Sequence, residues 1–264
     1  MDLQLLNKTA FISGSTAGIG FAIAHSLLQE GAKVIINGRT EDGVAAAVQE
    51  LKQLVSGADV SGLAADFSKA AEVSALIDQL PDVDILVNNA GIFEPKPFEE
   101  IPDEDWFRFF EVNVMSGIRL SRSIFPKMLA KNWGRIIFIS SESAVFIPDE
   151  MIHYGMTKTA QLAISRGLAE LSKGTGVTVN SILPGPTKSK GVVTFIEDLA
   201  RAGNISTDEV ETDFFKNLRP TSLLQRFASV EEIANTVTYY VSPLASATNG
   251  AAIRVEGGLV RSIL

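Results

Sequence analysis

Seven short runs of apolar and β-branched residues recur along the chain, and longer segments with helical spacing of their apolar residues lie between them. The runs are uniformly apolar, which is typical of parallel strands buried on both faces and not of strands with one face in water. Alternation of such strands with helices predicts a doubly wound α/β sheet with right-handed crossovers. The predicted strands are residues 9–13, 33–37, 60–64, 85–87, 135–140, 178–183 and 251–255.

The segments between these strands supply the helices that would cover the sheet. With 264 residues, 46% of them hydrophobic, the chain has enough apolar material for one large core. It contains no internal repeat and no low-complexity linker, so a single domain over residues 1–264 is predicted. The predicted helices are residues 19–29, 41–54, 70–79, 106–130, 154–172 and 230–241.

Charge and composition exclude several classes of protein. Lys and Arg number 23 against 31 Asp and Glu, a net charge of −8, so a surface that neutralises nucleic-acid phosphates is not expected. Without cysteine, disulfide frameworks, thiolate metal sites and cysteine nucleophiles are excluded. The only histidines are His25 and His153, so no metal site is predicted.

Nothing in the sequence predicts export or a membrane anchor. The N-terminus lacks the basic region of a signal peptide. Residues 9–29 and 233–253 carry no charge, but glycines interrupt the first stretch, and Pro243, Asn249 and Gly250 interrupt the second. Both fit a buried strand and helix better than a membrane span. A cytoplasmic protein is therefore expected.

A glycine-rich turn follows the first predicted strand, with Gly14, Gly18 and Gly20 spaced G-x-x-x-G-x-G. Glycines let the backbone approach a pyrophosphate, and the helix behind the turn offers unpaired N–H groups and a positive dipole end. Small or polar residues also follow the other strands, at the sheet edge where doubly wound folds bind their ligands. The sequence therefore predicts a dinucleotide site at this edge.

The end of the second strand indicates which dinucleotide is bound. An acid there would bind the ribose 2′-hydroxyl of NAD, but the chain has Gly38 followed by Arg39. A guanidinium can hold a 2′-phosphate, which a carboxylate would repel. NADP is therefore predicted as the cofactor, with NAD the less favoured alternative.

Tyr154 and Lys158 lie four residues apart at the start of a predicted helix, so both extend from one helix face. A tyrosine of pKa ~10 acts as a base near neutral pH only where its phenolate is stabilised, and a fixed ammonium can contribute to this. Ser141 ends a buried strand thirteen residues upstream of Tyr154 and could hydrogen-bond the same substrate oxygen. Together they predict an acid–base site.

The chain resembles the short-chain dehydrogenase/reductase (SDR) family over essentially its whole length. The resemblance rests on Ser13-Gly14-x-x-x-Gly18-Ile19-Gly20, Asn88-Asn89-Ala90-Gly91, Asn113, Ser141, Tyr154-x-x-x-Lys158 and Pro184-Gly185. It implies a single-domain Rossmann-type sheet of about seven parallel strands and hydride transfer between NAD(P) and a carbonyl or secondary alcohol.

The resemblance also implies roles for individual residues. Tyr154 would be the general acid/base, Ser141 would orient the substrate, Lys158 would bind the nicotinamide ribose and lower the tyrosine pKa, and Asn113 would hold a water in the proton relay. The cofactor would be bound by Gly14, Ser15, Gly18, Ile19, Gly20, Arg39, Asp66, Phe67, Asn88, Ala90, Gly91, Tyr154, Lys158, Pro184, Gly185 and Thr187.

Residues 191–218 interrupt the alternation of strands and helices. The segment lacks a strand but carries Phe195, Ile196, Leu199, Phe214 and Phe215 among acidic residues. A long strandless excursion in a compact domain is usually functional. We expect an amphipathic helical lid over the nicotinamide end of the site, with an apolar inner face that would suit a partly hydrophobic substrate.

Two residues beside the catalytic group depart from what the family resemblance implies. An acid, Glu142, follows Ser141, where it would either meet a polar substrate or face solvent. His153 precedes Tyr154 and is interpreted as a wall or solvent residue.

The sequence thus predicts an NADP-dependent oxidoreductase acting on a small carbonyl or alcohol. A 3-oxoacyl-[acyl-carrier-protein] reductase stays open as an alternative, as does a non-catalytic dinucleotide sensor. The resemblance further implies a homo-oligomer, a tetramer or a dimer, without nucleic-acid or membrane partners. The substrate and the physiological direction of the reaction are not determined by the sequence.

Overall fold

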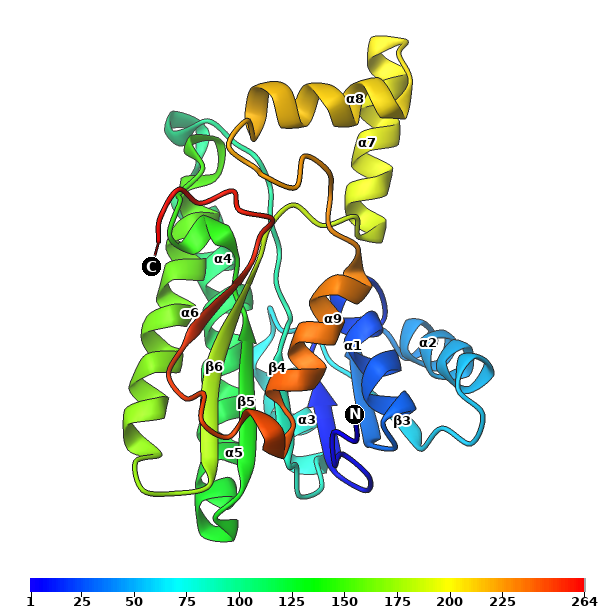
Figure 1. Ribbon diagram of the computed structural model, residues 1–264, viewed down its shortest axis with the longest axis vertical. Helices are drawn as coiled ribbons and strands as arrows, with labels where there is room; N and C mark the ends of the chain where they lie inside the picture. The colour runs from blue at the N-terminus through cyan, green and yellow to red at the C-terminus, as the bar shows by residue number, and fades with distance from the viewer. Residues whose placement is uncertain (264) are drawn as a thin grey trace.

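A computed structural model describes residues 1–263, and for Phe195 its backbone alone. Within them, seven parallel strands form one sheet in the order β3-β2-β1-β4-β5-β6-β7 (Figure 1). The reversal of strand order between β1 and β4 creates a switch point at the carboxyl edge. The strands are β1 (Thr9–Ile12), β2 (Lys33–Gly38), β3 (Val60–Ala64), β4 (Ile85–Asn88), β5 (Gly134–Ile139), β6 (Val177–Pro184) and β7 (Ala252–Val255).

Helices cover both faces of the sheet. One face packs Ile12, Ile36 and Val87 against α1, α2 and α9, and the other packs Phe11 and Phe138 against α3, α5 and α6. The α-helices are α1 (Gly18–Gln29), α2 (Glu41–Leu54), α3 (Ala70–Gln79), α4 (Asp103–Phe110), α5 (Ser116–Lys131), α6 (Ile152–Leu171), α7 (Lys190–Gly203), α8 (Thr207–Asp213) and α9 (Val230–Tyr240). This three-layer arrangement confirms the predicted fold class, because every strand of the sheet's centre is buried from both sides.

One predicted helix is divided in the structure. Residues 106–130 were expected as a single helix, but α4 and α5 are joined by the π-helical segment Glu111–Met115 (η2). The apolar spacing continues through both helices, so the pattern alone does not show the extra residue that a π-helical turn accommodates. Such turns occur frequently at functional sites, and this one carries the buried Asn113.

Residues 190–218 form α7, α8 and a second π-helical segment, Phe214–Leu218 (η5), between β6 and α9. In Figure 1, α7 and α8 stand at the upper end of the molecule, beyond the carboxyl ends of the strands. We call these residues the lid segment. The residues that lead into the lid segment and the return segment that follows it are joined by a parallel β-bridge between Thr187 and Ala228.

Only part of the apolar content of the lid segment is buried. Ile196, Ala200, Val210 and Phe215 form a cluster with Phe227 of the return segment, separate from the two clusters that flank the sheet. Leu199, Ile205 and Leu218 remain exposed. The prediction for Phe195 concerns a side chain outside the described part of the structure. The segment therefore has a small core of its own, and a partly hydrophobic substrate stays a prediction.

None of the helices within residues 1–263 combines the length and the apolar character needed to cross a bilayer.

Candidate active site

The glycine-rich turn between β1 and α1 lies at the switch point, beside the end of β4. Gly14 and Gly18 have φ values of +61° and +60°, which side-chain-bearing residues rarely adopt. A Cβ on Gly20 would lie 2.7 Å from the carbonyl oxygen of Gly14, so the turn closes only with glycine there. Helix α1 starts at Gly18 without a capping side chain and without an acid in its first turn. Its N-terminal dipole therefore faces the turn uncompensated, which suits a bound phosphate.

Two asparagines hold this turn in place. The buried Asn37 at the end of β2 accepts a hydrogen bond from Gly14 N (3.0 Å) through Oδ1, and its Nδ2 donates to Leu63 O (3.1 Å). From the other side, Asn89 Nδ2 donates to the carbonyl oxygen of Gly14 (2.8 Å). Sequence reasoning did not assign either residue to the site. The sequence does carry a signal for both, namely a polar residue at the end of a strand: Asn37 stands directly before Gly38, and Asn89 directly before Ala90.

The end of β2 leaves little room for an acidic side chain at position 38. A Cβ on Gly38 would lie 2.5 Å from Thr16 Cγ2 and 3.1 Å from Val44 Cγ2. Arg39 is exposed next to it, and its charge acts on Asp66 at the end of β3, where it helps hold the pKa of that carboxyl below its usual range. Hydrogen bonds from Ser68 are the larger cause of this lowered pKa.

Ser141, Tyr154 and Lys158 converge next to this edge. Ser141 follows β5 and caps a 3-10 turn, Glu142–Ala144 (η3), by accepting from Ser143 N (3.1 Å). Tyr154 and Lys158 extend from the first turns of α6, with Lys158 Nζ 5.5 Å from the centre of the Tyr154 ring. The ammonium donates to Ile139 O at the end of β5 (2.9 Å). Strand β5 and helix α6 thereby fix all three side chains.

Burial is the largest influence on the pKa values of Tyr154 and Lys158. It raises the pKa of Tyr154 above the ordinary value, and the neighbouring Glu142 carboxylate raises it further, while a hydrogen bond with Ser141 opposes both. Burial lowers the pKa of Lys158 to about 8, against the opposing attraction of Glu142. Tyr154 is therefore held as the neutral phenol at neutral pH, the form that can give up a proton.

Asn113 lies close to Lys158, and the side chain of Gln161 stands between them. Asn113 is fully buried, and its side chain bonds Ile92 N (2.8 Å) and Thr157 Oγ1 (3.0 Å). The carbonyl oxygen of Asn113 accepts from Gln161 Nε2 (2.6 Å), and Gln161 Oε1 lies 3.4 Å from Lys158 Nζ. Gln161, which sequence reasoning missed, therefore links Asn113 to Lys158 directly.

This geometry can be compared with known proteins. The family model described as short chain dehydrogenase matches residues 8–199, which include the glycine turn, Ser141, Tyr154 and Lys158. The chain belongs to the short-chain dehydrogenase family. It is an oxidoreductase of the group that acts on alcohols and carbonyls.

Three proteins illustrate the similarity of this dehydrogenase to known ones. An uncharacterized oxidoreductase of Bacillus subtilis (strain 168), YvrD, is 53% identical over 266 residues and covers 100% of both chains. The 3-oxoacyl-[acyl-carrier-protein] reductase of Escherichia coli (strain K12) is 33% identical, with 96% of this chain and 97% of the relative covered. The crystal structure of L-sorbose reductase from Gluconobacter frateurii, complexed with NADPH and L-sorbose, superposes with a TM-score of 0.93 at 31% identity, covering 100% of both chains.

Several residues predicted to bind the cofactor have side chains that hydrogen-bond or pack within the protein itself. Ser15 Oγ donates to Ile12 O (2.7 Å) and accepts from Asn37 N (2.9 Å). Phe67 is part of the core beneath α3, and Thr187 Oγ1 donates to Gly185 O (2.8 Å). For these residues, any cofactor contact would come chiefly from the backbone. Asn88 donates to Ser121 Oγ (3.2 Å), and its buried Oδ1 has no partner among the described residues.

Glu142 and His153, to which the sequence assigns no definite role, are both buried. His153 packs against the rings of Trp106 and Phe109, 4.1 Å from the Phe109 ring centre, and burial lowers its pKa. It is therefore a buried neutral side chain, which excludes the interpretation as a solvent residue. Glu142 is only 7% exposed, which corrects the interpretation of this side chain as one that faces solvent.

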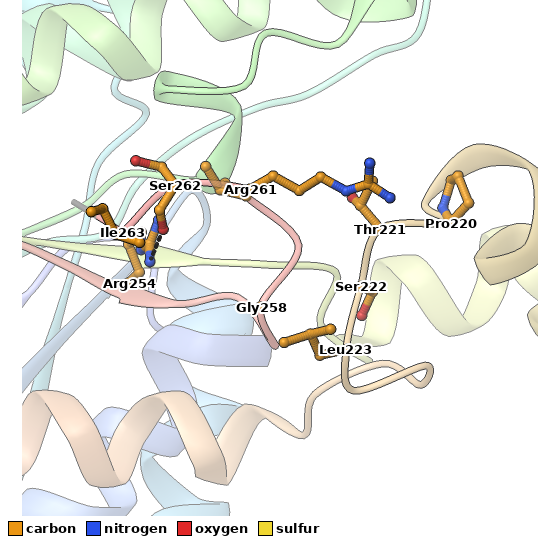
Figure 2. A pocket seen from close by; sticks show the side chains of 10 residues that line it. Pro220, Thr221, Ser222, Leu223, Arg254, Gly258, Arg261, Ser262 and Ile263 are labelled. Atoms are coloured by element: carbon orange, nitrogen blue, oxygen red, sulfur yellow. Dashed lines mark hydrogen bonds between the residues drawn. The ribbon is translucent and has the colours of Figure 1, made fainter.

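A cavity of about 510 Å³ lies apart from the predicted catalytic residues, between the C-terminal segment and residues 220–223 (Figure 2). Figure 2 shows Arg261 and Thr221 on its walls and the hydrogen bond from Arg254 to Ser262. Backbone bonds from Leu223 and Leu224 to Gly257 O join the same two segments. The C-terminal segment therefore anchors the return of the lid segment to the body of the dehydrogenase.

Proposed function

We propose that the enzyme is an NADP-dependent reductase of small, polar carbonyl compounds that works through Ser141, Tyr154 and Lys158. The observation that carries this proposal is the convergence of these three side chains at the carboxyl end of β5, next to the glycine turn. The bound nicotinamide would supply the hydride for carbonyl reduction and accept it in alcohol oxidation.

The residues at the switch point fit NADP. The glycine turn and the uncapped start of α1 would hold the pyrophosphate, and the buried, unpartnered Asn88 Oδ1 marks a polar site near the end of β4. The crowding at Gly38 disfavours a carboxylate at the position that would bind a 2′-hydroxyl, whereas the exposed Arg39 guanidinium suits a 2′-phosphate. NADPH in the sorbose reductase structure is consistent with this choice.

The catalytic side chains would divide the work between them. Tyr154, kept as the phenol by burial, would donate its proton to the substrate oxygen. Ser141 would donate a hydrogen bond to the same oxygen and stabilise its developing negative charge. Lys158 would orient the cofactor, and a water held by Asn113 would supply the proton that returns to Tyr154. Gln161, bonded to both Asn113 and Lys158, would keep these two residues in place. That Lys158 also lowers the Tyr154 pKa stays a prediction.

The surroundings of Ser141 favour a polar substrate. The carboxyl group of Glu142 lies directly against Ser141, and the charge of Arg219, after η5, acts on Glu142. The likeness to L-sorbose reductase supports a hydroxylated ketone as the substrate class. The alternative, reduction of carrier-bound 3-oxoacyl groups, is favoured by the likeness to the Escherichia coli reductase but opposed by the exposed acids of the lid segment, which would repel an acidic carrier.

Initial rates with NADPH and NADH, measured side by side on ketoses, short-chain ketones and a 3-oxoacyl thioester, test the proposal. We expect NADPH oxidation at least ten-fold faster than NADH oxidation, with the ketoses as the best substrates. Preference for NADH would overturn the cofactor assignment, and preference for the thioester would support the alternative. No turnover of any carbonyl, together with tight NADPH binding, would favour the non-catalytic sensor.

We also propose that the enzyme is a homo-oligomer built on the α5 and α6 faces. A mainly apolar groove there is lined by Ile118, Phe125, Pro126, Ile164 and Leu168. Light scattering at several concentrations would test this, and a monomer at all of them would contradict it.

A further inference from the structure

The mechanism proposed above leaves the buried carboxyl group of Glu142 without a role. Glu142 is almost fully enclosed, and its Oε2 lies 2.5 Å from Ser141 Oγ, with the hydrogen bond drawn from the serine to the carboxylate. An acid buried against the serine that is to contact substrate must affect how that serine uses its single proton.

The hydrogen-bonding capacity of Ser141 is limited. A hydroxyl has one proton to donate and two lone pairs to accept with. One lone pair of Ser141 Oγ already accepts from Ser143 N (3.1 Å). Tyr154 also forms a hydrogen bond with Ser141. With Glu142 ionised, the only proton of Ser141 is bound to the carboxylate, so Ser141 can only accept from Tyr154 and has no proton for the substrate oxygen.

Protonation of Glu142 reverses this hydrogen bond. The carboxylic acid donates to the second lone pair of Ser141 Oγ, and the serine proton is then free to point at the substrate oxygen beside the Tyr154 hydroxyl. The 2.5 Å separation of the two oxygens suits either direction of donation.

The charged groups that face Glu142 come from two other elements. Tyr154 and Lys158 face it from α6, and Arg219 faces it from the segment after η5. Arg219 already forms a salt bridge with Glu150 (2.7 Å), and its guanidinium carbon lies 5.7 Å from the centre of the Phe214 ring. Burial raises the pKa of Glu142 above the ordinary carboxyl value, against the smaller opposing effects of Ser141 and Arg219.

We propose that Glu142 is a positioning residue for Ser141: as the carboxylic acid it turns the serine hydroxyl toward the substrate oxygen, and as the carboxylate it withdraws that hydroxyl. The inference rests on the proposed carbonyl reductase activity. It implies that the rate of reduction falls as the pH rises through the pKa of Glu142, since only the protonated form leaves Ser141 free to donate.

The test is the pH profile of kcat/KM for carbonyl reduction in wild type, Glu142→Gln and Glu142→Leu. The glutamine amide donates to Ser141 Oγ at every pH, so Glu142→Gln should lose the basic limb that wild type shows above the ordinary carboxyl range. Glu142→Leu has no donor, and its kcat/KM should be about ten-fold lower across the profile, because the serine hydroxyl is no longer oriented. A basic limb unchanged in Glu142→Gln would overturn the proposal.

A double-mutant comparison separates positioning from a direct charge effect on Tyr154. In a Ser141→Ala background the further change Glu142→Gln should leave the pH profile unaltered, because the serine that transmits the effect is absent. If Glu142→Gln still moves the profile in that background, Glu142 acts through its charge on Tyr154 and the positioning role is wrong.

An infrared measurement keeps the inference testable apart from turnover. The carbonyl stretch of the protonated Glu142 carboxyl should appear as the pH falls below the pKa of Glu142, be absent in Glu142→Gln, and shift in Ser141→Ala. Absence of the band in wild type would overturn the inference even if carbonyls are reduced. If no carbonyl is reduced but the band is present and shifts, the proposed function fails, while the Glu142–Ser141 hydrogen bond stands.

Discussion

The carboxyl edge of the sheet and the lid segment beyond it are built differently (Figure 1). The edge is held by the buried Asn37 and Ser13 and the partly buried Asn89, each bonded to backbone atoms from other strands or turns. The lid segment is held by a small cluster of its own and by contacts at its base, among them the salt bridge between Lys188 and Glu211 and the one between Arg219 and Glu150.

This contrast separates two requirements of the reaction. Residues that orient cofactor and reacting atoms need a rigid frame, because small misplacements cost much of the rate. A segment that admits the substrate and then excludes water needs weak attachment to the body. The contacts of the edge suit the first requirement, and the looser attachment of the lid segment would suit the second.

The largest expected effect concerns the chemistry at the edge. Tyr154→Phe removes one hydroxyl, the predicted proton donor, so kcat should fall by about 10³-fold or more while NADPH affinity changes only a few-fold. Steady-state kinetics and cofactor titration measure both quantities. Tyr239→Phe on the partly exposed face of α9 is the matched control. Turnover near the wild-type rate in folded Tyr154→Phe would refute the mechanism.

The same substitution in each region should have unequal effects on stability. Phe138→Ala opens a cavity under α5 in the main core and should lower the free energy of unfolding by about 3–5 kcal/mol. Phe215→Ala opens the lid cluster and should act mainly on the lid segment, with a global loss of about 1 kcal/mol. Denaturant unfolding of both variants measures the difference. Equal global losses would show that the lid segment unfolds together with the sheet.

Cofactor choice should depend on one charge at the edge. Arg39→Asp places a carboxylate where the 2′-phosphate is expected, and the ratio of kcat/KM for NADPH over NADH should fall by about 10- to 100-fold. Lys52→Asp in the last turn of α2 makes the same change of charge away from the site and should leave the ratio unchanged. A ratio unaffected by Arg39→Asp would assign the 2′-phosphate to other residues.

The smallest expected effect is the closure of the lid segment, which we propose occurs over the bound substrate. Hydrogen exchange of residues 190–218 should slow when NADP and a substrate analogue bind together, and less with NADP alone. The turn around Gly14 should be protected by NADP in both cases, which provides the internal control. Protection at the turn without any change in the lid segment would leave the cofactor site intact and contradict the closure.

Much of this architecture follows from local patterns. The sequence predicts both ends of every strand to within one residue, because uniformly apolar β-branched runs have few alternatives to a buried parallel strand. The glycine turn and the Tyr154–Lys158 pair were also predictable, since both depend on spacing within one short segment. The π-helical turn that carries Asn113 was not, because its extra residue leaves the apolar pattern of residues 106–130 unbroken.

The sequence by itself determined the strands, the fold class and the family resemblance, since apolar runs and short motifs are local patterns; it also predicted the dinucleotide edge and the acid–base pair. Only the tertiary structure decided that Glu142 is buried against Ser141, that Gln161 links Asn113 to Lys158, and that part of the lid segment forms a core of its own. These facts depend on which distant segments exclude water from a side chain. Neither composition nor spacing records that, because burial is a property of neighbours brought together by the fold.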